Sequence, residues 1–107
     1  MSERQPTPPL FEVRLRAEHL AEIESWDERV RARLFAFLRD HVAHIPTTGV
    51  PGILKELREP FGGHYQLTVS RRRRLIYRVD DERGLVLVIY VGLHPDWRRS
   101  RPGRITP

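Results

Sequence analysis

The sequence contains no cysteine, so disulfide bonds and thiolate nucleophiles are both excluded. No apolar run approaches the ~20 residues that cross a bilayer, and the first ten residues, MSERQPTPPL, lack the apolar stretch of a secretory signal. The longer glycine-rich pattern of a phosphate-cradling P-loop is also missing. These absences predict a cytoplasmic protein with no membrane contact and no cysteine-based chemistry.

Positive charge is concentrated in the C-terminal half of the 107 residues, which are enough for one domain with a modest core. Residues 1–61 carry 9 Lys and Arg against 10 Asp and Glu, whereas residues 62–107 carry 10 against 4. The formal net charge of +5 therefore belongs to the second half. Such a field predicts an anionic partner, either nucleic acid or an acidic protein segment.

Hydrophobic spacing in the first half predicts a strand followed by two helices. Residues 11–16, FEVRLR, alternate apolar and charged side chains as a half-buried strand does. Three-residue spacing over 17–26 predicts a short helix, with His19 on its surface. A stripe from Val30 to Ile45 then predicts a helix of about five turns that Pro46 ends. The first ten residues are expected to form a flexible tail.

The second half reads as three antiparallel strands. HYQLTVS alternates, so Gln66 and Thr68 are expected on a wet face; LIYRV follows an arginine bend, and DDERG is a hairpin turn. Residues 85–91, LVLVIYV, are apolar throughout and predict a central strand. ILKELREPFGG, residues 53–63, is either a helical turn or a short extended piece. Residues 99–107 are expected to form a disordered basic tail.

These elements predict an α+β domain: an N-terminal strand, a two-helix hairpin, then a three-stranded antiparallel meander, with the helices packed on one face of the sheet. The opposite face would be partly polar and would carry Gln66, Thr68, Arg74 and Arg78.

The order of these elements, the segment LKELREPFGGHYQLTVSRRRRLIYRVDDERGLVLVIYVGLH and the ending GLHPDW resemble the RelE/ParE toxins of bacterial toxin–antitoxin pairs. The resemblance covers residues 11–98 and leaves tails at 1–10 and 99–107. It implies a RelE-like fold, ribonuclease activity on mRNA, usually in the ribosomal A site, and no cofactor. It also implies a cognate antitoxin that wraps the toxin, and a toxin–antitoxin hetero-oligomer that binds operator DNA.

The resemblance also implies roles for individual residues. Arg74, before LIY, corresponds to a guanidinium that holds the scissile phosphate, and His94 corresponds to the arginine or histidine of a Gly-x-Arg/His motif. Trp97 corresponds to an aromatic that stacks on a base or joins in acid–base work. Gln66 and Thr68 stand where several relatives carry basic residues, and His64 is the candidate second histidine.

Elementary chemistry supports the same residue types. Metal-independent RNA cleavage needs a base for the 2′-hydroxyl, an acid for the leaving 5′-oxygen and cations for the phosphorane. Histidine titrates near neutrality, and arginine binds phosphate through two parallel hydrogen bonds. We therefore expect His94, Arg74 and His64 to be catalytic. The expected contacts with RNA or phosphate are Arg78, Arg73, Arg72, Trp97, Gln66 and Thr68.

Several alternatives remain open at this point. The arginine run, residues 71–74, has a simpler explanation as solvated charge at a bend, and Trp97 could be a lid over the edge of the core. Because Gln66 and Thr68 are not basic, the chain could be a ParE-like toxin that binds DNA gyrase and cleaves no RNA. A third alternative is a catalytically silent toxin fold that acts with an antitoxin in transcriptional repression.

Overall fold

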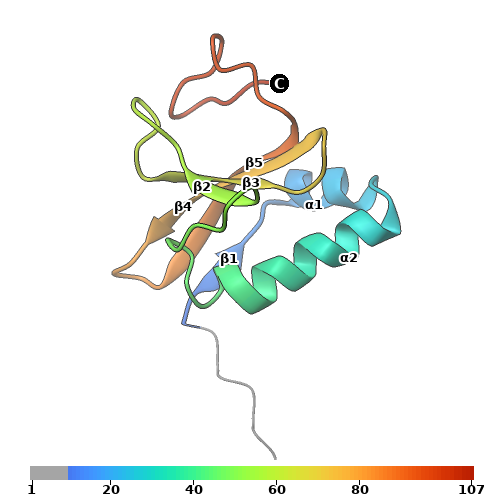
Figure 1. Cartoon of the computed structure of the whole chain (residues 1–107), viewed down its shortest axis with the longest axis horizontal. Coiled ribbons are helices and arrows are strands. Elements are labelled where there is room, and N and C mark those ends of the chain that lie inside the picture. The colour runs from blue at the N-terminus through green and yellow to red at the C-terminus, as the bar shows by residue number, and fades with distance from the viewer. Residues whose placement is uncertain (1–9) are drawn as a thin grey trace, which may run out of the picture.

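The computed structural model describes residues 10–107, which form an α+β domain (Figure 1). The five strands lie in one sheet of order β1-β5-β4-β3-β2, in which β1 runs parallel to β5 and the other neighbours are antiparallel. The elements are β1 Glu12–Arg14, α1 Ala17–Glu24, α2 Glu28–Phe37, the π-helical turn η1 Leu38–Val42, β2 Leu54–Glu56, β3 His64–Thr68, β4 Arg73–Asp80 and β5 Leu85–Leu93.

The predicted class and chain order are confirmed, and the sheet gains a strand at each edge. The meander of β3, β4 and β5 forms the centre, and β1 joins it beside β5. The ambiguous segment after Pro51 proves to be extended, because β2 pairs with β3 from Leu54 to Glu56. Within residues 10–107, no helix is both long and apolar enough to cross a membrane.

The helices cover one face of the sheet and form the main core with it (Figure 1). Ile23 of α1 and Leu34 of α2 are almost completely buried against sheet residues such as Leu75 and Tyr77. Burial of each such side chain contributes about 1.5–3 kcal/mol. The apolar side chains that recur every second residue in the strands and every three to four residues in the helices therefore pack together at this face.

The second helix is shorter than its apolar stripe predicts. It begins at the N-cap Asp27, whose side chain accepts a hydrogen bond from the Arg29 N–H at 2.8 Å. It closes after Val42 with the π-type bond from the Ala43 N–H to the Leu38 carbonyl, and Ile45 is left exposed. The Ala43 carbonyl then accepts the N–H groups of Leu10 and Phe11, which ties the start of β1 to the end of the helix.

His19 is buried, contrary to the prediction that it lies on the helix surface. Only 6% of it is exposed, and its Nδ1 accepts a hydrogen bond from the Arg16 N–H at the N-terminus of α1. Its neighbour in the apolar pattern, Leu20, is the exposed one instead. The helix is thus rotated by about one residue from the predicted orientation, and a polar ring serves as a cap.

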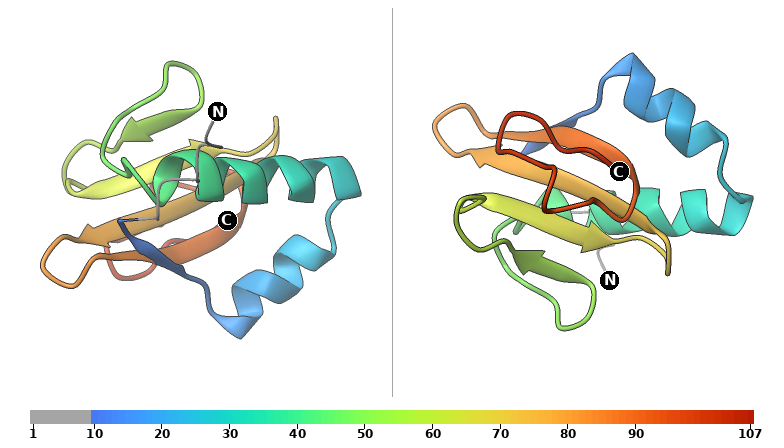
Figure 2. Two further views of the ribbon diagram at one scale, coloured as in Figure 1. Left: turned by 90° about the horizontal axis from the view of Figure 1, so that it is seen from below. Right: turned by 90° about the horizontal axis from the view of Figure 1, so that it is seen from above.

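The outer face of the sheet, opposite the helices, is also covered. Figures 1 and 2 show the C-terminal strap, which we define as residues 95–107, folded back over this face. On this face Ile76 and Tyr90 are 0% and 8% exposed, and Gln66 is buried at 5%. The sequence predicted that this face of the sheet is exposed to solvent, but only the edges of the face are exposed.

The strap is held closed by its own hydrogen bonds. The Asp96 N–H donates to the Thr106 carbonyl at 2.9 Å, the buried Ser100 hydroxyl donates to the Asp96 carbonyl, and the Thr106 N–H donates to that hydroxyl. Arg101 and Arg104 exchange two backbone hydrogen bonds at its tip. This differs from the disordered tail expected over 99–107, because composition does not reveal bonds that close a loop. Of the flexible tail predicted over residues 1–10, residues 1–9 lie outside the described residues.

Candidate active site

His94 lies just beyond the end of β5 and is held by one bond from its backbone and one from its ring. Its backbone N–H donates to the Arg72 carbonyl at 3.0 Å, and its Nδ1 lies 2.9 Å from the Pro95 carbonyl. A carbonyl oxygen only accepts, so Nδ1 carries the proton of the neutral ring and Nε2 is left as a free acceptor. Because the residue is exposed, this nitrogen is available to a substrate.

Arg74 lies beside His94, opposite Gly92 of β5. Its Nη1 donates to three carbonyls of the preceding bend: Ser70 at 2.8 Å, Arg73 at 3.0 Å and Arg71 at 3.3 Å. Its Nε is buried and has no hydrogen-bond partner among the described residues. The bend therefore fixes the guanidinium through Nη1 and leaves the buried Nε without a partner.

The other arginines of the bend point in different directions. Arg71 and Arg72 are exposed, whereas the Arg73 guanidinium lies 5.8 Å from the centre of the Trp26 ring. Odd-numbered residues of β4 face the helices, so Arg73 stabilises the packing of the bend against the segment between α1 and α2. The sequence predicted that Arg73 contacts RNA. In the structure, alternation along the strand turns Arg73 away from the outer face and toward the helices.

His64 and Arg78 form a cross-strand pair at the other end of the outer face. In the ladder, Arg78 lies six residues from Arg72, whose carbonyl binds His94; at ~3.3 Å per residue this separates the pair from His94 by about 20 Å. His64 is buried, its Nδ1 lies 3.3 Å from the Gly62 carbonyl and its Nε2 has no partner. At this separation His64 and Arg78 cannot act on the same substrate group as His94.

Gln66 and Thr68 occupy the middle of the outer face. Gln66 is opposite Ile76, with its Oε1 buried and unpaired among residues 10–107. Thr68 is half-buried and lies opposite Arg74, so it is the nearer of the two to the candidate site. Neither side chain is a general base.

Trp97 packs on Phe61, with ring centroids 4.9 Å apart at an angle of 61°. Both rings line a hollow of about 560 Å³ along β2 and the following loop, together with Lys55 and Arg58. The sequence pattern predicted a role for Trp97 alone. Phe61 was missed, because no local periodicity indicates that a residue between a cis-proline and two glycines will meet the chain 36 positions later.

The sheet therefore separates the predicted residues into two groups. His94, Arg74 and the exposed Arg72 gather at one end, whereas His64 and Arg78 lie at the other. Among residues 10–107, no group of three or more His, Asp or Glu side chains is placed to hold a metal ion.

No protein-family model matches the sequence, and no curated protein matches it. The structure, in contrast, matches solved toxins. A chain of the RelBE2 toxin–antitoxin complex from Mycobacterium tuberculosis has a TM-score of 0.61 at 23% identity, over 81% of this chain and 100% of that chain. The YoeB/ParE toxin from Agrobacterium tumefaciens has a TM-score of 0.65 at 18% identity, over 78% and 99%.

A third solved structure, the archaeal RelE–RelB complex from Pyrococcus horikoshii, contains a chain with a TM-score of 0.58 at 15% identity, over 78% of this chain and 94% of that chain. All three similarities extend over nearly the whole of the matched chains. The resemblance seen in the sequence is thus confirmed for the fold, and this chain has the fold of the RelE/ParE toxins.

Proposed function

We propose that this protein is the toxin of a type II toxin–antitoxin pair and acts as a RelE-like endoribonuclease that cleaves mRNA on the ribosome. The observation that carries the proposal is the geometry of His94. When one ring nitrogen is hydrogen-bonded to a carbonyl, the other nitrogen of this exposed residue is left as the acceptor for a substrate proton.

In the proposed reaction, His94 Nε2 takes the proton of a ribose 2′-hydroxyl. The 2′-oxygen then attacks the adjacent phosphorus, the bond to the 5′-oxygen breaks, and that oxygen takes a proton from water as it leaves, while protonated His94 returns its proton to the solvent. The products are a 2′,3′-cyclic phosphate and a 5′-hydroxyl. A positioned acid–base group typically contributes about 100- to 10,000-fold to the rate.

Arg74 would hold the phosphate during this step. Its guanidinium is oriented by three carbonyls of the bend, so little freedom is lost when a phosphate binds. Charge on the phosphorane oxygens would then develop beside a fixed cation. Arg72 is exposed at the same end of the sheet and adds positive potential there.

The proposed partner is a cognate antitoxin with an acidic or amphipathic segment that neutralises this basic end. Two of the similar structures are named as complexes, RelBE2 and RelE–RelB. A toxin–antitoxin hetero-oligomer of this kind would bind operator DNA.

A ParE-like toxin that binds DNA gyrase is the second candidate. It is favoured by the absence of basic side chains at Gln66 and Thr68, and by the separation of His64 from His94. A nuclease with one histidine at its centre would be slower than one with two.

Primer extension on a reporter mRNA, after brief induction of the wild-type protein, distinguishes the two candidates. The nuclease proposal expects new cleavage ends that His94→Ala removes or weakens by about a hundredfold. His44→Ala is the matched control, because His44 lies beside the β1 and α2 surface and not on the outer face. Growth arrest without new RNA ends would reject the nuclease and direct the work to gyrase.

A further inference from the structure

We infer that the strap binds the backbone of single-stranded RNA through its four arginines, Arg98, Arg99, Arg101 and Arg104, and so guides the chain to His94. The choice of RNA as the ligand rests on the proposed function. The binding surface itself rests on the strap's geometry and charge.

The strap is a built loop with a defined shape. Bonds between Asp96 and Thr106 join its two ends, and Ser100 is buried at the centre with bonds to both. The ring of Trp97 contacts the ring of Phe61, which attaches the strap to the loop between β2 and β3. Since the loop is already ordered, its side chains are presented to a ligand without a large loss of backbone entropy.

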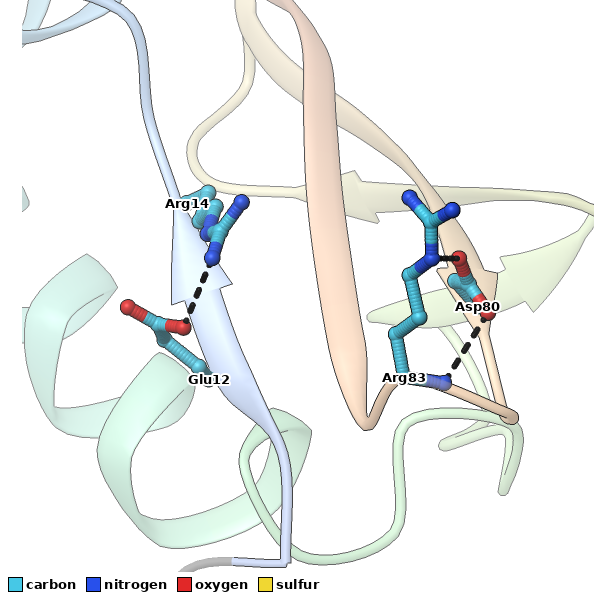
Figure 3. Close-up of polar contacts among 4 residues, drawn as sticks. All are labelled: Glu12, Arg14, Asp80 and Arg83. Carbon is cyan, nitrogen blue, oxygen red and sulfur yellow. Dashed lines mark hydrogen bonds and ion pairs between the residues drawn. The ribbon is translucent and has the colours of Figure 1, made fainter.

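All four arginines of the strap are exposed, and none takes part in the ion pairs found within residues 10–107. Outside the strap, four exposed arginines do form ion pairs with acids close in sequence: Arg14, Arg16, Arg39 and Arg83. Figure 3 shows Arg14 paired with Glu12 at 3.3 Å and Arg83 paired with Asp80 at 3.8 Å. The one acid of the strap, Asp96, accepts the Arg98 backbone N–H instead. Four unpaired like charges on one closed loop repel one another, and an anion would relieve that repulsion.

His94 lies between two sets of exposed arginines. The strap begins at the next residue, and the bend carrying Arg71 and Arg72 is bonded to the His94 backbone. A phosphodiester chain that follows positive charge from the bend to the strap would therefore pass the free Nε2 of His94. Figure 2 shows the strap lying over the sheet from the end of β5.

A polyanion fits this surface better than a folded protein does. Protein interfaces are anchored by buried aromatic or aliphatic side chains. The outward-facing residues of the strap are arginines together with Pro102, Gly103 and Pro107, whereas Ile105 and Trp97 are partly buried. Arginine forks without apolar anchors are typical of contacts with phosphate.

The test measures binding of the full chain to a short labelled RNA that carries 2′-O-methyl groups and cannot be cut. The strap variant is Arg98→Gln, Arg99→Gln, Arg101→Gln and Arg104→Gln together. We expect its affinity to be about ten- to a hundredfold weaker at ~100 mM salt, and its slope of log K against log salt to fall by roughly two to three.

A matched control removes the same charge from the other half of the chain: Arg14→Gln, Arg29→Gln, Arg33→Gln and Arg39→Gln, all exposed. The control should lose less than about threefold in affinity. Equal losses in the two variants would show a diffuse charge effect, and unchanged binding by the strap variant would show that its charges serve another partner. Either result overturns the inference. Because the RNA is not cut, binding by the strap and failure of the nuclease proposal are separate outcomes.

Discussion

At the scale of single residues, Arg74 has both a structural and a proposed catalytic task. Its Nη1 binds three carbonyls of the bend while its Nε remains unpaired. A lysine has the same charge but only one nitrogen, without the planar fork. A lysine at this position therefore cannot both close the bend and align a phosphate.

We predict that Arg74→Lys lowers the free energy of unfolding by about 1–2 kcal/mol, because at least one bend carbonyl loses its donor. RNA cleavage should fall by roughly a hundredfold, since the phosphate is no longer held by a fixed donor pair. Urea denaturation and primer extension measure the two effects.

Arg72→Lys is the control for this substitution, because Arg72 is exposed at the same bend. It should leave stability unchanged and weaken cleavage only slightly. Full cleavage by Arg74→Lys would show that Arg74 serves the bend alone.

At the scale of elements, the start of α1 depends on a buried histidine. His19 Nδ1 accepts the Arg16 N–H, which only an unprotonated nitrogen does. Burial lowers the pKa of His19 from its ordinary value of 6.5; the charge of Arg16 lowers it further, and Glu18 opposes both. The neutral ring is thus the form that the folded state prefers.

The sign of the pH effect follows from this lowered pKa. The unfolded chain binds the proton more readily, so the contribution of His19 to stability is present above pH 6.5 and is lost as the pH falls below that value. We predict that the wild type loses more stability between pH ~7.5 and ~5 than His19→Gln does.

Glutamine is the matched replacement, because a glutamine three residues after the N-cap can accept the same backbone N–H and does not titrate. Urea denaturation of both proteins at the two pH values isolates the histidine from the other titrating groups. Equal losses in the two proteins would contradict this account of the cap.

At the scale of the whole molecule, the sheet is covered on both faces. The helices cover the face that carries Leu75 and Tyr77, and the strap lies over the opposite face (Figure 1), on which Ile76 and Tyr90 are buried. Alternate residues of β4 are therefore buried in two different layers. A sheet with one wet face would expose every second residue of this strand.

We predict that Ile76→Ala destabilises the protein by about 2–5 kcal/mol, as expected for a buried isoleucine. Leu75→Ala, on the helix side, should cause a loss of similar size. The measurement is the urea midpoint of each variant. If Ile76→Ala costs less than about 0.5 kcal/mol, as surface substitutions do, the strap does not form a packed layer in solution.

Local patterns in the sequence were sufficient for much of the fold. The alternation of Phe11, Val13 and Leu15, the stripe through Leu34 and Leu38, and the apolar strand from Leu85 onward each depend on neighbours within one element. The concentration of charge after residue 61 is likewise a property of the chain itself. These features predicted the α+β class, the order of elements and the exposure of Arg71 and Arg72.

The composition of the candidate site was decided only by tertiary structure. The ladder register places Arg74 opposite Gly92 but His64 opposite Arg78, so two histidines that look equivalent in the sequence lie at different ends of the sheet. The contact between Trp97 of the strap and Phe61 joins segments more than 30 residues apart. The burial of Gln66 likewise depends on more than its own strand. Periodicity reports which face of an element is apolar, but long-range packing decides what covers that face and which side chains meet on it.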